Sequence, residues 1–336
     1  MDVPGGLQMH IQGFAHTGFT GSDQKGTTNS FFLGNFDFAI SSQLAEHFSV
    51  LSELTFEPDV NNDMTVDLER MLLVYSANDH LQLSFGRSHT SIGYYNTAYH
   101  HSTWLQTTTE RPFLFAFEDQ GGILPIHTVG VSASGQIPSG KLGLHYVAEV
   151  GNGRESRSPL DQEPVENIVA EQNHKAYNFA VFARPEAVRG VQAGFSIYRD
   201  LLDPITQADP NGLPVQETIL AAHAVYIRPS FEFLNEALVV RHTPQGGHLF
   251  QTPGFYSQIS KRFGSYRPYF RYEYVNGSDN EPIFPDVGHR EGPSAGLRYD
   301  ASEFVALKLQ YDYRTVRDRQ ANQSINGLTM QLGFTF

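Results

Sequence analysis

Residues Asn326–Phe336 read NGLTMQLGFTF and alternate between apolar and polar positions throughout. One face of an extended chain would carry Leu328, Met330, Leu332, Phe334 and Phe336. The opposite face would carry Gly327, Thr329, Gln331, Gly333 and Thr335. A period of two residues is typical of a β-strand with one apolar and one polar face. The pattern therefore predicts an amphipathic strand at this end of the chain.

The same alternation recurs along the whole sequence. In Phe304–Thr315, the face with Leu307 and Leu309 is apolar, and the face with Lys308 is polar. Together with the last stretch, we count sixteen such segments. The other fifteen are Leu7–Thr17, Phe31–Ser42, Phe48–Phe56, Met64–Ser76, Leu81–Gly86, His127–Gly135, Lys141–Val150, Ala176–Pro185, Val191–Asp200, Glu217–Pro229, Phe231–His242, Phe255–Phe263, Tyr266–Val275, Gly292–Asp300 and Phe304–Thr315.

The connections between these segments alternate between short and long. Glu186–Gly190 and Gly264–Ser265 are short, whereas Gly151–Lys175 and Asn276–Glu291 are long. Transmembrane barrels have short turns at one end and longer loops at the other, and each strand needs about 9–11 residues to span the bilayer. An even number of strands also places both termini at the short-turn end. We find no sequence repeat and no domain boundary, so we predict a single barrel domain over residues 1–336.

Composition excludes several other classes of protein. The 336 residues include 23 basic and 36 acidic side chains, which gives a net charge of −13, and there is no Cys. The absence of Cys rules out disulfide scaffolds, iron–sulfur clusters and thiol catalysis. An acidic chain without a long basic run is not expected to bind nucleic acid. The longest apolar runs, such as Met71–Tyr75, are far shorter than the roughly 20 residues of a spanning helix.

A soluble all-β protein, such as a propeller or a pair of sandwiches, is the alternative to a membrane barrel. In those folds the apolar face points inward. Charged residues on the polar faces of several segments, and aromatic residues clustered at segment ends, favour a water-filled lumen and interfacial girdles. We therefore predict an all-β fold: a 16-stranded antiparallel transmembrane β-barrel. The N-terminus lacks the features of a signal peptide, so either the protein is not exported or the signal peptide has been removed; we favour removal.

The longest stretch without alternation is Gly86–Ile126, between the fifth and sixth segments. It contains the only Trp of the chain, Trp104, and several Tyr and Phe residues. Aromatic content of this kind needs a surface to pack against, so we predict an ordered loop over about residues 87–126. Long loops in compact proteins are usually functional or disordered.

The loop carries a resemblance to a known family. Phe85–Arg87 leads to Ile92–Tyr94, and a Thr-rich stretch leads to Glu-Arg in Thr107–Arg111. Over about 30 residues this arrangement is similar to the phosphate-selective porin O and P family of bacterial outer-membrane porins. The resemblance implies a third loop that folds into the pore and narrows it, and it implies a homotrimer. Small residues in the first strands would support close subunit contact: Gly13, Ala15, Gly34 and Ser52.

Charged residues of the loop and of the polar strand faces are candidates for the pore constriction. Acidic loop residues opposite basic wall residues would produce a transverse field that orients hydrated solutes. The candidates are Arg87, Glu110, Arg111, Glu118, Asp119, Arg267, Arg271 and Arg314. Glu53, Asp67 and Glu69 are also expected to point inward. Arg70 breaks the alternation of its strand, which a β-bulge or burial at a subunit interface would explain.

Four aromatic residues of the loop have two possible roles. They could stack on sugar-like solutes, or they could pack the loop against the barrel wall. These residues are Tyr94, Tyr95, Tyr99 and Trp104.

Neither a metal site nor an active site is predicted. His100 and His101 are adjacent, so their side chains would point in opposite directions on an extended chain, and no accompanying ligand spacing is present. A His/Ser pair for hydrolysis is also missing, because His145 and His223 have no adjacent Ser. We expect no cofactor and no enzymatic activity.

The predicted function is that of an outer-membrane porin in a Gram-negative bacterium, a passive channel for small hydrophilic solutes or ions. The expected partners are outer-membrane lipid and further copies of the chain in a trimer. The negative net charge predicts a mild preference for cations, although basic residues at the constriction would oppose it. The alternative is a barrel scaffold or sheath that docks a partner protein in an outer-membrane complex.

Overall fold

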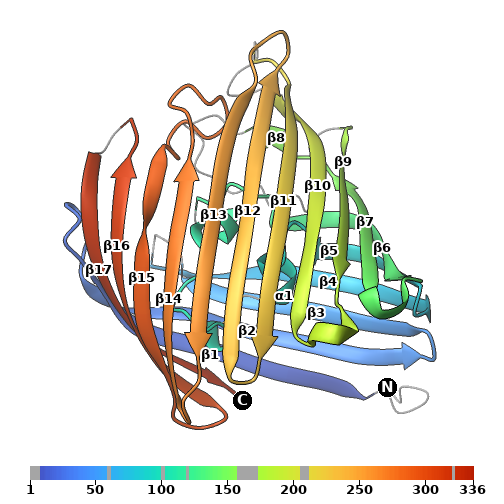
Figure 1. Cartoon of the computed structure of the whole chain (residues 1–336), viewed down its shortest axis with the longest axis horizontal. Coiled ribbons are helices and arrows are strands. Elements are labelled where there is room, and N and C mark those ends of the chain that lie inside the picture. The colour runs from blue at the N-terminus through green and yellow to red at the C-terminus, as the bar shows by residue number, and fades with distance from the viewer. Residues whose placement is uncertain are drawn as a thin grey trace.

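The computed structural model describes residues 8–58, 62–99, 103–118, 121–156, 173–204, 212–319 and 322–336. These residues form a closed barrel of 16 antiparallel strands, as predicted (Figure 1). A closed single sheet is incompatible with a propeller or a pair of sandwiches. One further two-residue strand, β8 (Glu155–Ser156), pairs in parallel with the end of β10.

The barrel strands follow chain order, and each pairs with its neighbours. They are β1 (Met9–Ser22), β2 (Ser30–Ala45), β3 (Phe48–Pro58), β4 (Met64–Asn78), β5 (Leu81–His89), β6 (His127–Ile137), β7 (Leu144–Asn152), β9 (Lys175–Ala183), β10 (Val191–Pro204), β11 (Val215–Arg228), β12 (Phe231–Pro244), β13 (Phe250–Lys261), β14 (Tyr266–Asn276), β15 (His289–Asp300), β16 (Val305–Arg317) and β17 (Asn322–Thr335).

The barrel closes between its first and last strands. β1 pairs with β17 from Phe14↔Thr335 to Ser22↔Gly327, and with β2 on its other side. Phe336 continues this ladder, because its backbone exchanges two hydrogen bonds with Gly13. Figure 1 shows the C-terminus and the start of β1 at the same end as the short turn between β11 and β12. Closure gives every barrel strand a neighbour on both sides, so the sheet has no edge strand, as a sheet in lipid requires.

The two faces of the barrel have the polarity that the alternation predicted. On β16, Leu307 and Leu309 lie on the outside and are 45% and 47% exposed. Lys308, Gln310 and Asp312 lie on the opposite, inner face and are buried. Similar exposed apolar side chains cover other strands: Phe195, Phe233, Phe255, Phe270 and Met330. An apolar exterior and a polar interior are typical of a transmembrane barrel.

The irregularity at Arg70 is a β-bulge. In the β3–β4 ladder, Glu53 pairs with Arg70 and Leu54 pairs with Leu68, so Glu69 is an extra residue. Arg70 is thereby turned to the inner face, where its Nε lies 2.7 Å from Glu53 Oε2. The bulge, rather than a subunit interface, accounts for the break in alternation.

Several strands extend further towards the long loops than the alternation predicted. β17 begins at Asn322, β13 begins at Phe250 and β10 ends at Pro204. Both faces of a strand can be wet beyond the apolar belt, so alternation fades there while the hydrogen-bond ladder continues. Some strands start or end short of the predicted segment at the short-turn end. Gly140–Leu142 forms a 3₁₀ turn (η4), so β7 starts only at Leu144, and β9 ends at Ala183.

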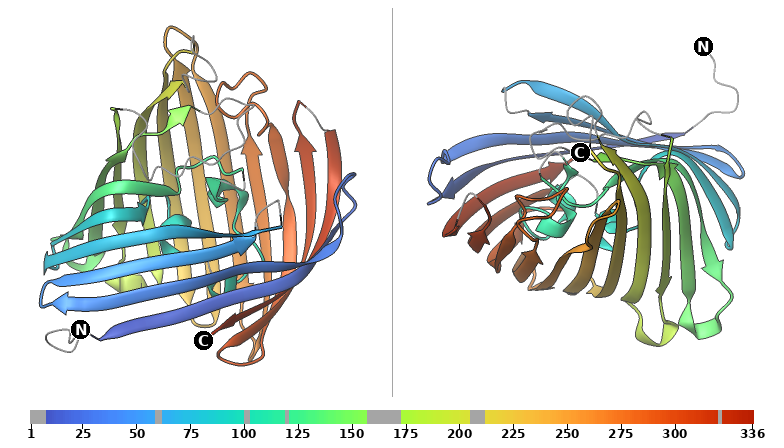
Figure 2. Two further views of the ribbon diagram at one scale, coloured as in Figure 1. Left: turned by 180° about the vertical axis from the view of Figure 1, so that it is seen from behind. Right: turned by 90° about the horizontal axis from the view of Figure 1, so that it is seen from above.

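The connection between β5 and β6, residues 90–126, is called L3 here, and its described residues, 90–99, 103–118 and 121–126, lie inside the barrel (Figure 2). It contains the short helix α1 (Tyr95–Ala98) and the 3₁₀ turns η1 (Thr103–Leu105) and η2 (Phe113–Phe115). In the described part of the chain, no helix is long and apolar enough to cross a membrane.

Candidate functional site

L3 starts and ends at adjacent points of the wall. His89, the last residue of β5, pairs with His127, the first residue of β6. The described residues of L3 lie in the lumen between these two points (Figure 2). The site therefore consists of L3 and the inner faces of the strands it touches.

One side of L3 forms a hydrophobic core with the wall. Its side chains pack against apolar residues that replace the usual polar lining of the strands. The loop contributes Ile92, Tyr95, Leu114, Phe115, Phe117, Ile123, Leu124 and Ile126. The wall contributes Tyr198, Ile219, Ala221, Val225, Leu234, Leu238, Val240, Tyr256 and Val275. This packing explains why an aromatic-rich loop is ordered.

Two carboxylates of β12 accept hydrogen bonds from the start of L3. Glu236 accepts from the backbone N–H of Tyr95 at 2.9 Å and from the hydroxyl of Tyr256 at 2.6 Å. Glu232 accepts from the hydroxyl of Tyr99 at 3.0 Å. Sequence reasoning did not single out Glu232 or Glu236. Their position on a polar strand face was visible, but the chain that would lie against them was not.

Basic wall residues on the other side of L3 hold its backbone. Arg271 donates to the carbonyl oxygen of Glu110 at 2.9 Å and to Thr108 Oγ1 at 3.1 Å. Arg298 donates to the carbonyl oxygen of Trp104 at 2.7 Å. Lys308 donates to the carbonyl oxygen of Thr108 at 2.7 Å. These cations bind the loop itself, so they do not simply face it across open water.

Glu110 and Arg314 differ from these buried anchors because both are exposed. Their side chains form an ion pair and are 44% and 43% exposed, and Arg271 lies 3.8 Å from the same carboxylate. L3 and the wall enclose a cavity of about 320 Å³ at this point. Its lining includes Phe113, Glu273, Arg290, Glu291, Arg314 and Asp318. The structure thus brings together three of the predicted constriction residues, and two of them, Glu110 and Arg314, are accessible to water.

The other predicted constriction residues lie elsewhere. Arg111 is buried inside L3, where its guanidinium donates to the carbonyl oxygen of Tyr99 and to Asn96 Oδ1 and lies 4.2 Å from the centre of the Phe117 ring. Arg267 donates to the carbonyl oxygen of Pro229 near the β11–β12 turn, apart from the L3 contacts. Arg111 therefore stabilises the loop, and Arg267 belongs to the short-turn end.

Two further candidates lie at the base of L3. Arg87 is buried and donates from Nε to the carbonyl oxygen of Glu69. Glu118 is buried and accepts hydrogen bonds from the backbone N–H groups of Ile126 and His127. Asp119 and the pair His100–His101 lie outside the described residues.

The aromatic candidates are all in contact with the loop or the wall. Tyr95 is 1% exposed and stacks on Tyr99 with ring centres 4.5 Å apart. Trp104 lies 6.1 Å from the Phe14 ring of β1. Tyr94 is partly exposed, and burial together with the Glu232 and Glu236 carboxylates raises its pKa to about 12. It remains a neutral hydroxyl at physiological pH.

A larger cavity lies at the short-turn side of L3. It has a volume of about 1000 Å³. L3 lines it with Tyr94, Thr97 and Ala98, and the wall adds Phe182, Arg184, Glu186, Arg189, Gln192 and Ile227. L3 thus separates a cavity facing the long loops from one facing the short turns.

No family model and no curated protein matches the chain. Solved structures do match. An anion-selective porin from Comamonas acidovorans superimposes with a TM-score of 0.70 at 11% identity, over 98% of this chain and 100% of that one. The chain has the porin fold. The resemblance to the phosphate-selective porins finds no support in these comparisons.

Two other solved structures agree on the fold. OmpF of Salmonella typhi, in complex with daunomycin, matches with a TM-score of 0.65 at 11% identity, over 98% of both chains. The trimer form of OmpT, an outer membrane protein of Vibrio cholerae, matches with a TM-score of 0.62 at 9% identity, over 98% of this chain and 99% of that chain.

Proposed function

We propose that this protein is a passive channel for small hydrophilic solutes or ions in the outer membrane of a Gram-negative bacterium. The observation that carries the proposal is a polar lumen, inside an apolar exterior, crossed by a loop that lies between two cavities. Such a lumen suits hydrated solutes, because charged and polar wall residues replace part of their water shell.

We propose that L3 is the constriction. Its hydrophobic core holds it to β10–β14, and its backbone is held by Arg271, Arg298 and Lys308. Solutes would pass beside the exposed pair Glu110–Arg314, the point where charges of both signs are accessible.

A mild preference for cations is proposed from the charge distribution. The cavity beside Arg314 is lined by three acidic residues, Glu273, Glu291 and Asp318, and by two basic ones, Arg290 and Arg314. The net charge of −13 adds to this local excess. Because exposed charges are screened within about 8 Å at physiological salt, the preference should be weak.

A scaffold that sheathes or docks a partner protein is the competing function. A sheath needs an open lumen, and L3 fills part of it with a packed core. This observation favours the channel.

We also propose a homotrimer. Gly13 and Gly34 do not provide the expected open surface, because Phe336 covers Gly13 and the imidazole of His16 lies against Gly34. Five of the six most exposed large apolar side chains instead lie on β1, β2 and β4, including Phe31 at 84%. The others are Met9, Ile11, Leu33 and Val66. Native mass spectrometry in mild detergent should give a trimer, and a species that is only monomeric would contradict this proposal.

Conductance in planar bilayers tests the channel directly. Folded protein should produce stepwise conductance, and the reversal potential in a salt gradient should have the sign of a weak cation preference. Folded protein without conductance would instead support the scaffold.

A further inference from the structure

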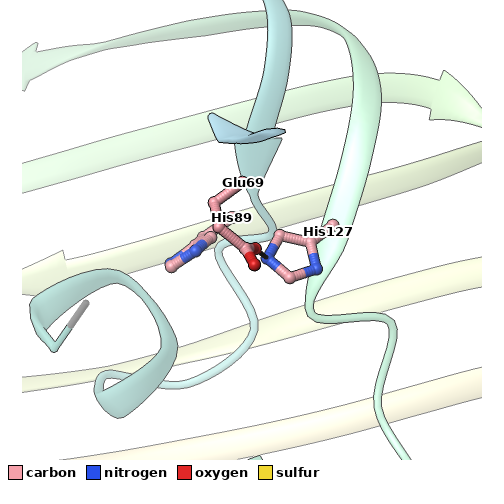
Figure 3. A group of neighbouring side chains, drawn as sticks. All are labelled: Glu69, His89 and His127. Carbon is pink, nitrogen blue, oxygen red and sulfur yellow. Dashed lines mark ion pairs between the residues drawn. The ribbon is translucent and has the colours of Figure 1, made fainter. Parts of the chain in front are cut away.

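Glu69, His89 and His127 form a compact cluster at the base of L3 (Figure 3). One ligand atom from each residue lies within 4.8 Å of the other two. All three side chains are buried, with exposed fractions of 3%, 6% and 6%. The cluster is separate from the Glu110–Arg314 pair and from the two cavities.

The fold brings these residues together from three strands. Glu69 is the extra residue of the β3–β4 bulge, and His89 and His127 face each other in the β5–β6 ladder. Their positions in the chain are 20 and 38 residues apart, so no local spacing marks the cluster.

In both histidines, Nδ1 lies near a hydrogen-bond acceptor outside the three-residue cluster. Nδ1 of His89 lies 2.9 Å from the carbonyl oxygen of Asn96, which can only accept, so Nδ1 carries the proton. The lone pair of the neutral His89 ring is therefore on Nε2. Nδ1 of His127 lies 3.3 Å from Glu118 Oε2, and its Nε2 lies 2.8 Å from Glu69 Oε2. Metal-binding histidines typically donate their second ring N–H to a carbonyl or carboxylate in this way.

We propose that Glu69, His89 and His127 bind a divalent transition-metal cation at the base of L3. Two imidazole nitrogens and one carboxylate are a ligand set that suits Zn²⁺. When both are ionised, the carboxylates of Glu69 and Glu118 carry two negative charges, which balance the two positive charges of a divalent ion. Arg111 interacts electrostatically with both carboxylates and opposes binding, so the affinity should be moderate.

A bound ion would connect β4, β5 and β6 where L3 leaves and rejoins the wall. It would hold the two ends of the proposed constriction at a fixed separation. The site does not depend on conduction, because the ligands are part of the wall whatever passes through the lumen.

Zn²⁺ titration of chelator-treated, folded protein in detergent tests the proposal. We expect one Zn²⁺ per chain, measured by competition with a chromophoric chelator. His89→Gln and Glu69→Gln should each weaken binding by more than about 100-fold. Glu118→Gln removes the carboxylate charge beside His127 Nδ1 but no ligand, and it should weaken binding by about 10–100-fold. His223→Gln is the matched control: His223 is also a buried lumen histidine, but its Nε2 lies 3.2 Å from Gln192, and binding should not change.

Two outcomes would overturn the site. One is folded wild-type protein that binds no Zn²⁺. The other is binding that His89→Gln and Glu69→Gln leave at the level of the control. Heat-modifiable gel mobility checks that each variant folds. X-ray absorption of the Zn²⁺-loaded wild type needs no variant and should count two imidazole ligands; fewer than two would also overturn the proposal.

Discussion

At the scale of single residues, exposure separates charges that hold L3 from charges that a solute can reach. Arg271 and Arg111 are buried, and their guanidinium groups bond to L3. Glu110 and Arg314 are nearly half exposed. The sequence analysis named all four as constriction candidates and could not tell these roles apart.

Neutralising Glu110 and neutralising Arg314 should shift ion selectivity in opposite directions. Arg314→Gln should increase the cation preference and Glu110→Gln should reduce it. The permeability ratio should change about two-fold, because an exposed charge contributes only ~0.4 kcal/mol. Reversal potentials in a salt gradient measure this change. Arg262→Gln is the control, because Arg262 is equally exposed and pairs with Asp300 at the short-turn end. Equal shifts in all three variants would contradict the assignment.

Gly86, directly before Arg87, is required by the backbone. Its φ is +127°, and a Cβ there would lie 1.9 Å from the carbonyl oxygen of Met71. Gly86→Ala should destabilise the barrel by about 1–3 kcal/mol, measured by urea unfolding in lipid vesicles. Gly246→Ala is the matched control, since Gly246 also has positive φ, at +73°, but nothing within 4 Å of its Cβ. Equal stability of the two variants would refute the steric argument.

At the scale of elements, L3 is held by contacts with strands from most of the barrel. Its hydrophobic side packs on β10–β14, and its backbone is bound by side chains of β14, β15 and β16. Sequence analysis correctly placed an ordered loop between β5 and β6. The wall residues that contact this loop are those that lie at the height of the loop along the barrel axis. Periodicity shows which face of a strand points inward, but it does not show that height.

Removing one anchor should loosen the proposed constriction. Arg271→Ala deletes a fully buried guanidinium that bonds to Thr108 and Glu110, and it should cost about 3–5 kcal/mol. We expect larger or noisier single-channel conductance. Arg267→Ala removes an arginine from the same face of β14 that bonds only near the turn in the described contacts, and it should leave conductance unchanged. If both variants behave alike, Arg271 is not an L3 anchor.

At the scale of the whole molecule, the pairing of β1 with β17 closes the barrel. The folded protein in detergent should give a β-type circular dichroism spectrum. It should also migrate differently on gels before and after heating, because the closed hydrogen-bond ladder resists detergent until it is heated. A stable, water-soluble monomer without detergent would contradict the membrane barrel.

The number of strands, the polarity of their faces and the position of L3 followed from the sequence alone. Alternation has a period of two and survives wherever one face meets lipid and the other meets water. The break in alternation at Arg70 was also visible, but the structure was needed to choose a β-bulge over a subunit interface as its cause.

Tertiary structure alone determined which inward residues meet. The Glu69–His89–His127 cluster, the carboxylates Glu232 and Glu236 beneath L3, and the separation of Arg267 from Arg271 all depend on strand register and on the path of the loop. Contacts between residues more than 100 positions apart, such as Lys308 with Thr108, leave no periodic trace in the chain. The physical reason is that alternation records the solvent on each side of a strand, whereas a site depends on three-dimensional distances between side chains.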